Sequence, residues 1–205
     1  MSTSGRGGNA ARSEAARERV LQATLRALAA NGYQGSSLAG IAEAAGLTTA
    51  GLLHHFPSKE QLLVAVLAER DRSDGARHHL RGVQGLAALD RLVELVEFNT
   101  LVPGLVRAFT VLLGEAVSED HPAREWFQQR YPKRRDNIAA ALRAGIDTGE
   151  ILADVDADAV AAEIIAMMDG LQVQWLLNPD QIDLAAAFAH YIRGLRNAIS
   201  SENRP

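Results

Sequence analysis

One stretch decides how this chain folds, and it reads Ser37-Leu38-Ala39-Gly40-Ile41-Ala42-Glu43-Ala44-Ala45-Gly46-Leu47-Thr48-Thr49-Ala50-Gly51-Leu52-Leu53-His54-His55. Its first half has the apolar spacing of one helix face, at Leu38, Ile41, Ala42 and Ala45. Gly46 can adopt the positive φ that a tight turn between two helices requires. Thr48 then begins a second short helix, in which Leu52 faces inward. The stretch therefore predicts a helix-turn-helix from about Ser37 to His55.

The outer face of the second short helix is small and polar. A helix of this kind can approach the floor of the DNA major groove closely. The residues left on or near this outside are Thr48, Thr49, Ala50, Gly51, His54 and His55. These residues are the candidates for contact with DNA.

Helical patterns flank this stretch on both sides. A helix is expected from Ser13 to about Asn31, where Asn31-Gly32 ends it. Ser36 or Ser37 is expected to cap the next helix. After Pro57, Ser58 and Gln61 have the S-x-x-Q spacing of a capping box, so a further helix begins at Ser58 and continues to Arg72 or beyond.

Strand patterns are nearly absent, and Ala, Leu, Glu and Arg dominate. About nine helices are therefore expected in an all-α fold. Residues 1–12 are rich in Gly and Ser and read as a disordered leader, residues 13–72 as a helix-turn-helix domain, and residues 73–205 as a C-terminal helical bundle. The five longer helices of the bundle are expected at about 87–100, 104–117, 122–148, 157–177 and 184–200.

Composition narrows the function classes. The chain has no cysteine, which excludes disulfides and thiolate metal sites. Its net charge is -4, but residues 1–72 hold eight basic and six acidic residues, against 13 and 19 in residues 73–205. This asymmetry favours contact between the N-terminal part and a polyanion. No signal peptide is recognised and no apolar run reaches the ~20 residues of a membrane span, so a cytoplasmic protein without membrane contact is expected.

Two runs resemble the signature of the tetracycline-repressor (TetR) family. The first is Ile41-Ala42 with Ala45-Gly46-Leu47, and the second is Gly51-Leu52-Leu53-His54-His55-Phe56-Pro57-Ser58-Lys59-Glu60-Gln61-Leu62-Leu63. The match extends without a gap from about Val20 to Leu67. The resemblance implies a bacterial, dimeric DNA-binding regulator with a larger C-terminal domain for small effectors. A repressor released from a pseudo-palindromic operator by its effector is the function it favours, with activation as an open alternative.

The resemblance also implies roles for single residues. Ser37 lies where the family contacts a phosphate, and Lys59 opens a helix where an ammonium and the helix N-terminus share a phosphate. Thr49 is the best candidate for a base contact, and His54 and His55 lie near the sugar-phosphate backbone. The chain departs from the family at Leu53, where a tyrosine is usual, and at Gly51, where threonine is common. Both changes remove a usual contact, which leaves specificity more dependent on DNA shape.

The C-terminal domain offers candidates for a pocket and for a dimer interface. Large, adaptable side chains are expected to line an effector pocket between helices: Phe98, Phe109, Trp126, Met167, Met168 and Trp175. The last two long helices are expected to form the homodimer interface through Ala162, Ile165, Ala166, Phe188, Ile192 and Leu195.

Other classes of function lack their motifs. A di-iron bundle enzyme needs Glu-x-x-His pairs, and no Glu or Asp here has a His three residues on. Adjacent His54 and His55 diverge by ~100° on a helix and do not converge on one ion. No catalytic residue, metal site or cofactor is therefore expected, and the enzyme class is rejected. A helical adaptor without DNA contact is a further alternative, which only Leu53 favours.

Overall fold

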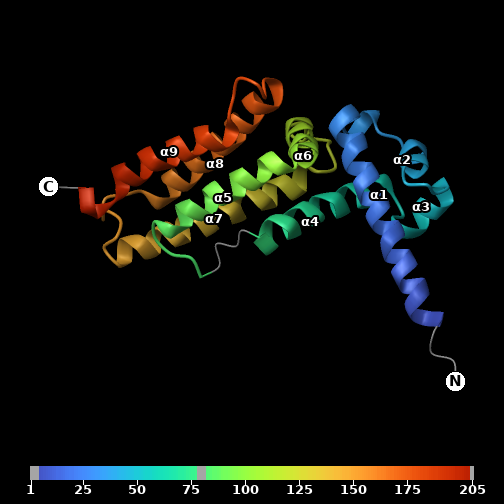
Figure 1. Ribbon diagram of the computed structural model, residues 1–205, viewed down its shortest axis with the longest axis horizontal. Helices are drawn as coiled ribbons and strands as arrows, with labels where there is room; N and C mark the ends of the chain where they lie inside the picture. The colour runs from blue at the N-terminus through green and yellow to red at the C-terminus, as the bar shows by residue number, and fades with distance from the viewer. Residues whose placement is uncertain (1–4, 78–81, 204–205) are drawn as a thin grey trace. The chain divides into compact units, whose positions relative to one another are not determined.

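The computed structural model describes residues 5–77 and 82–203, and its regular elements there are helical apart from one isolated bridge between Ile151 and Ser200. This confirms the all-α prediction (Figure 1). The described elements are α1 (Gly5–Gly35), α2 (Leu38–Ala44), α3 (Thr49–His55), α4 (Lys59–Arg77), α5 (Ala87–Leu101), α6 (Pro103–Glu115), α7 (Arg124–Asp147), α8 (Ala157–Leu177), α9 (Leu184–Ile199) and the short 3-10 turn Ser201–Asn203.

The chain forms two compact units. The first comprises Met1–Arg70 and Arg107–Arg124, and the second Asp71–Val106 and Glu125–Pro205. The segment Arg107–Arg124 thus lies in the N-terminal unit, although the sequence pattern placed it in the C-terminal bundle. The expected boundary at residue 72 also falls inside α4, which continues to Arg77 because its polar C-terminal turns contain no proline to stop a helix.

The start of α1 corrects the sequence interpretation. The leader was expected to be disordered to residue 12, yet α1 begins at Gly5. Ala10, Ala11 and Arg12 favour helix, and extending an existing helix adds a hydrogen bond for each residue fixed. The first four residues lie outside the described part of the chain.

The first unit packs α1 to α4 around one apolar core. In α1 one side of the helix is buried, with Val20 and Leu28 no more than 2% exposed. The chain breaks at Gly32, whose φ of 66° and ψ of -173° are not helical. Leucines of α4 complete the core, and Leu62 and Leu63 are both 1% exposed. This core fixes the orientation of α2 and α3.

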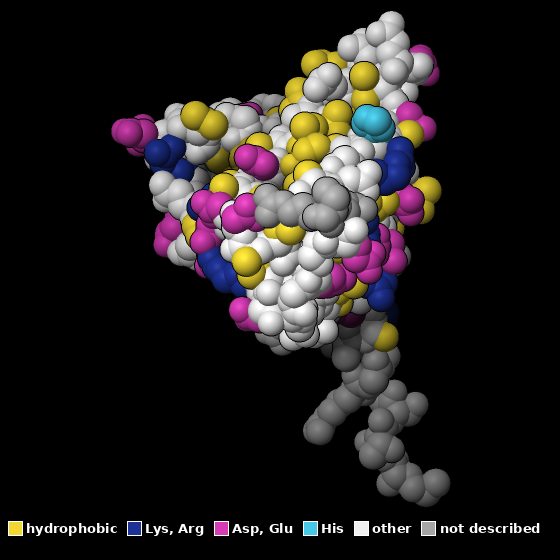
Figure 2. All heavy atoms as spheres, turned by 90° about the vertical axis from the view of Figure 1, so that its left-hand side faces the viewer, with side chains coloured by type: hydrophobic (Ala, Val, Ile, Leu, Met, Phe, Trp, Pro, Cys, Tyr) yellow, Lys and Arg dark blue, Asp and Glu magenta, His cyan; other side chains and the backbone are white. Residues whose placement is uncertain are grey.

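The second unit is a bundle of α5, α7, α8 and α9, which run alongside one another in Figure 1. Helix α9 packs on both α5 and α8. Its large apolar residues Leu184, Phe188 and Ile192 are at most 2% exposed and lie in the core. Figure 2 shows apolar side chains gathered on the upper part of one face of the molecule, toward the projecting α8–α9 connection.

Candidate nucleic-acid interface

The turn between α2 and α3 has the geometry that the sequence predicts. Gly46 has a φ of 69°, a conformation that favours glycine. The N–H of Gly46 donates to the Glu43 carbonyl at 3.0 Å, and that of Leu47 donates to the Ala42 carbonyl at 2.9 Å. These two hydrogen bonds close the end of α2 and set the direction in which α3 leaves the turn.

Both short helices are capped by hydroxyl side chains. Ser37 Oγ accepts a hydrogen bond from the N–H of Gly40 at 3.1 Å, and Thr48 Oγ1 accepts one from that of Gly51 at 3.0 Å. Ser37, and not Ser36, is therefore the cap, because the Ser36 hydroxyl donates to the Gly32 carbonyl at 2.7 Å. A hydroxyl that accepts one bond keeps its own proton for another acceptor. Ser37 and Thr48 thus retain a donor at the surface.

The inner and outer faces of α3 are clearly separated. Leu52 is 0% and Phe56 3% exposed, so these two side chains anchor the helix. Most of the other predicted contact residues are exposed: Ser37, Thr48, Thr49, Ala50 and His54. His55 and Gly51 are partly buried, and a Cβ at Gly51 would lie 3.3 Å from Thr48 Oγ1 rather than in open space. Gly51 therefore lies at the edge of this outer face.

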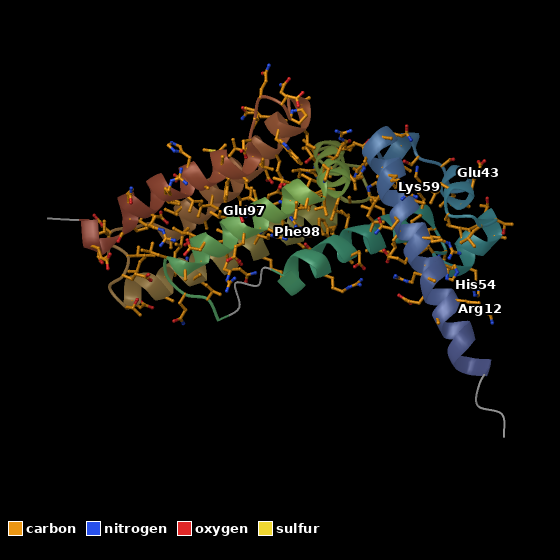
Figure 3. All side chains as sticks on the ribbon, viewed as in Figure 1. Arg12, Glu43, His54, Lys59, Glu97 and Phe98 are labelled. Atoms are coloured by element: carbon orange, nitrogen blue, oxygen red, sulfur yellow. The ribbon has the colours of Figure 1, made fainter. Side chains whose placement is uncertain are left out.

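Leu53 is also on the outside. It is 36% exposed, while the adjacent Leu52 is fully buried. His54 is labelled in Figure 3, and its imidazole lies edge-on to that of His55, with ring centroids 5.6 Å apart. In the described part of the chain, no group of three or more His, Asp or Glu side chains could hold a metal ion.

Lys59 lies at the first turn of α4 and is held by Tyr33. Its Nζ lies 4.3 Å from the centroid of the Tyr33 ring, a cation–π distance. The Tyr33 hydroxyl donates to Glu60 Oε1 at 3.0 Å. Burial, and then the Glu60 carboxylate, raise the pKa of Tyr33 to about 12. Hydrogen bonds from its own backbone, Ser58 and Tyr33 lower the pKa of Glu60. Tyr33 therefore stays protonated and orders the start of α4.

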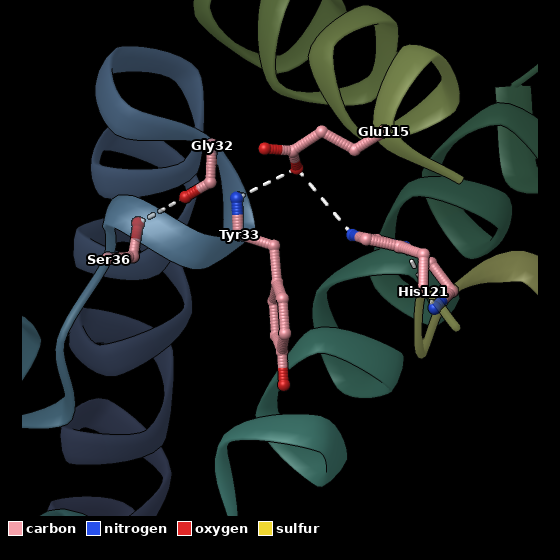
Figure 4. Close-up of polar contacts among 6 residues, drawn as sticks. Gly32, Tyr33, Ser36, Glu115 and His121 are labelled. Carbon is pink, nitrogen blue, oxygen red and sulfur yellow. Dashed lines mark hydrogen bonds and ion pairs between the residues drawn. The ribbon is translucent and has the colours of Figure 1, made fainter. Parts of the chain in front are cut away.

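The same tyrosine contacts the segment Arg107–Arg124. The N–H of Tyr33 donates to Glu115 Oε2 at 2.8 Å, and His121 Nε2 lies 3.6 Å from the same oxygen (Figure 4). The His121 ring packs edge-on to the Tyr33 ring, with centroids 5.2 Å apart. Burial lowers the pKa of His121, and Glu115 opposes that shift. The sequence reading missed this cluster, because nothing local in it links these positions.

The predicted effector residues do not all lie together. Phe109 belongs to the first unit and the other five to the second. Phe98 lies on α5, where Figure 3 labels it, and is partly buried, as is Trp126 on α7. Met168 and Trp175 pack against the core of the second unit, and Met167 is 37% exposed on α8. Successive residues of a helix point in different directions, so Met167 lies at the surface while the adjacent Met168 faces the core.

Two polar pairs inside the second unit were missed from the sequence. Asn99 Nδ2 donates to Gln172 Oε1 at 3.3 Å, and these residues are 1% and 4% exposed. The Tyr131 hydroxyl donates to Asp169 Oδ2 at 2.5 Å, and burial followed by Asp169 raises the pKa of Tyr131. Asp169 and Gln172 lie three residues apart on α8, so they share a face. The available signal was polar residues at helical spacing in an otherwise apolar helix.

The predicted dimer residues divide into two groups. Phe188 and Ile192 are 0% and 2% exposed inside the protomer, so their side chains have no surface left to bury against a partner. For these two residues the prediction is corrected, because the large apolar stripe of α9 fills its own core. Ile165 and Leu195 are partly buried, while Ala162 and Ala166 are exposed on α8.

Comparisons with known proteins find transcriptional regulators along most of the chain. Residues 20–66 match the family described as "Bacterial regulatory proteins, tetR family", and residues 86–199 match "BetI-type transcriptional repressor, C-terminal". The chain is 31% identical over 176 residues to the HTH-type transcriptional regulator TtgR of Pseudomonas putida, covering 82% of this chain and 83% of that protein.

Solved structures are similar over nearly the whole chain. A transcriptional regulator from Saccharomonospora viridis in complex with choline is 26% identical, with a TM-score of 0.76 over 90% of this chain and 97% of that one. A TetR transcriptional regulator from Chloroflexus aurantiacus is also 26% identical, with a TM-score of 0.75 over 92% of this chain and 98% of that one.

Proposed function

This chain belongs to the tetR family of bacterial helix-turn-helix transcriptional regulators, and we propose that it is a homodimeric repressor that a small effector releases from its operator. The family consists of regulators and not of enzymes. A regulator of this kind acts on DNA in the cytoplasm. The observation that carries the proposal is the α2–α3 pair, which is anchored by buried residues and presents a small, polar outer face.

We assign the DNA contacts by their chemistry. The hydroxyls of Ser37 and Thr48 donate to phosphate oxygens, which fixes the register of the protein on the duplex. Thr49 and His54 are exposed on the recognition helix α3 and reach base edges or nearby backbone. Lys59 supplies a positive charge at the first turn of α4, where helix N–H groups favour an anion. Its ammonium must then share the Tyr33 ring and a phosphate, or move from one to the other.

The exposed face of α8 is the surface we propose for a second copy. Helix α8 is long and apolar enough to cross a membrane by composition, yet only 22% of that window is buried. A helix that is apolar over most of its surface needs cover over most of that surface. The residues left exposed are mostly small or apolar: Ala162, Ala166, Met167, Gly170, Val173 and Leu177.

A partner protein suits this face better than lipid does. Glu163 is exposed on α8 and Asp169 lies further along the same helix, and carboxylates inside a bilayer are costly. The bent pair α5 and α6 also passes the compositional test, but turns by 103° at its break. In a two-fold dimer the same α8 face meets its copy, and small residues allow close helix packing. Ala162 and Ala166 remain in the proposed interface, and Phe188 and Ile192 leave it.

The effector site is proposed within the second unit, where the core changes from apolar to mixed. Here the pairs Asn99–Gln172 and Tyr131–Asp169 lie on α5, α7 and α8. Convergent polar groups among aromatic and Met side chains are typical of small-molecule sites. The solved relative with bound choline supports a small-molecule effector in general. Coupling of ~1–3 kcal/mol between the sites would change operator affinity ~5–150-fold.

The test is DNA binding by the full chain. Duplexes that cover the DNA upstream of its own gene and its neighbours are titrated in a gel shift, with a scrambled duplex as the control. We expect binding to the native duplex that weakens steeply with salt, because phosphate contacts release counterions. Equal binding to both duplexes, or no binding at any salt concentration, would contradict the proposal.

A further inference from the structure

Helix α3 turns an apolar pair outward. Ala50 and Leu53 are three residues apart and so occupy one face of the helix. Both are exposed, and Leu53 is 36% exposed although leucine gains more from burial than from contact with water. Leu52 and Phe56 are buried and hold the helix in this rotation. The pair is therefore a fixed feature of the outer face.

The hydrogen-bonding repertoire of α3 is small. Its sequence, Thr49 to His55, contains no Arg, Lys, Asn or Gln, the side chains that make bidentate contacts with guanine or adenine. The polar side chains of the helix are Thr49 and the two imidazoles. Apolar contact is therefore the main means left by which the centre of this helix could discriminate between bases.

One base edge in the major groove offers an apolar group. Thymine carries a C5-methyl there, and cytosine has hydrogen at that position. We propose that Ala50 and Leu53 read a thymine in each operator half-site through this methyl group. The inference rests on the proposed function, and it names the base chemistry that α3 recognises. It also assigns Leu53 a role of its own: this leucine adds an apolar contact with DNA at the position where the family usually has tyrosine.

The experiment removes the methyl group and nothing else. Wild-type protein first selects its preferred duplex from a random-sequence pool. Each thymine of that duplex is then replaced singly by deoxyuridine, which keeps the pairing and the hydrogen-bonding edge. We expect one position in each half-site at which the replacement weakens binding about fourfold, the effect of one buried methylene-sized group.

The Leu53→Ala variant connects that effect to the side chain. It should bind the thymine duplex more weakly, and its preference for that duplex over the deoxyuridine duplex should fall below the wild-type value of about fourfold, because only Ala50 still contacts the methyl group. Leu101→Ala, the same truncation at a 77% exposed leucine of α5, should leave both affinities unchanged. Circular dichroism checks that each variant is folded, which we expect because both leucines are surface residues.

Two outcomes would overturn the inference. One is a duplex in which every thymine can be replaced without loss of affinity. The other is a folded Leu53→Ala variant that keeps the full preference for thymine. In both cases, salt-sensitive binding to the selected duplex would leave the proposed repressor function standing. Failure to select any duplex would instead count against that function.

Discussion

The Glu115 carboxylate accepts a hydrogen bond from the backbone N–H of Tyr33, at 2.8 Å and across 82 positions of sequence. The same Tyr33 lies under the Lys59 ammonium and donates to Glu60. One residue thus connects the segment Arg107–Arg124 to the first turn of α4, inside a single compact unit. This contact makes that segment part of the DNA-binding unit.

Loss of the Glu115 carboxylate should destabilise this unit. In Glu115→Ala the partly buried N–H of Tyr33 loses its acceptor, and leaving such a donor unpaired costs about 1 kcal/mol. Glu115→Gln keeps an acceptor oxygen, so its free energy of unfolding should fall much less. Urea unfolding measures both, with Glu119→Ala as an exposed acidic control from the same segment. Equal stability of Glu115→Ala and the control would show that the contact contributes nothing.

Gly32→Ala should be more damaging than an ordinary glycine substitution. Its φ of 66° disfavours any side chain, and a Cβ there would lie 2.1 Å from Glu115 Oε1. The expected cost is about 1–3 kcal/mol. Gly114→Ala is the matched control, because it lies in α6 with no atom within 4 Å of its Cβ and should stabilise slightly. Thermal unfolding compares them, and a neutral Gly32→Ala would refute the strain argument.

His121 should make the protein sensitive to acid. Its Nδ1 accepts a hydrogen bond from the N–H of Ala123 at 3.2 Å. Protonation of Nδ1 would place its N–H against the N–H of Ala123, so that two donors would face each other. Its pKa is lowered by burial, so the unfolded chain binds the proton more readily than the folded one. The contribution of neutral His121 to the free energy of unfolding is therefore complete above pH ~6.5, and it is lost as the pH falls through the lower pKa of the folded protein.

A substitution tests that pH dependence. His121→Asn keeps an acceptor for Ala123 but does not titrate, so its stability should fall less between about pH 8 and about pH 5 than that of the wild type. His190→Asn, at an exposed position of α9, should keep the wild-type profile. Urea unfolding at each pH gives both curves. Parallel curves for His121→Asn and wild type would exclude His121 as the sensor.

Lys59 and Thr49 should affect DNA binding in different ways. Lys59→Ala removes a phosphate contact, so affinity should fall on every sequence and the salt slope should decrease by about 1. Thr49→Ala should mainly change which sequence is preferred. Fluorescence anisotropy with several duplexes separates the two effects, and Lys133→Ala at an exposed site on α7 serves as control. A Lys59→Ala variant with an unchanged salt slope would remove Lys59 from the interface.

A charge on the outer face of α8 should separate the protomers. Ala166 is exposed, so Ala166→Glu leaves the core intact and places a carboxylate against its symmetry copy. Sedimentation velocity should show a dimer for the wild type and a monomer for this variant. Ala140→Glu, the same change at an exposed site on α7, should remain a dimer. A dimeric Ala166→Glu variant would place the interface elsewhere.

The sequence by itself determined the local features of the helix-turn-helix. The Ser37 and Thr48 caps and the Gly46 turn depend on hydrogen bonds between residues three to five positions apart, which composition and spacing encode directly. The inward position of Leu52 follows from the apolar spacing of the same stretch. The family signature spans the same stretch. For these reasons the helix-turn-helix and the all-α class could be predicted correctly.

Tertiary structure alone decided what each buried face packs against. A stripe such as Phe188 and Ile192 indicates burial, but not whether its own core or a partner covers it. The contacts Tyr33–Glu115 and Asn99–Gln172 join positions 82 and 73 residues apart, and no local pattern encodes them. The orientation of Leu53 could not be predicted from the sequence either. The sequence shows only that leucine replaces the usual tyrosine, and the orientation of α3, fixed by buried Leu52, is what turns the Leu53 side chain outward.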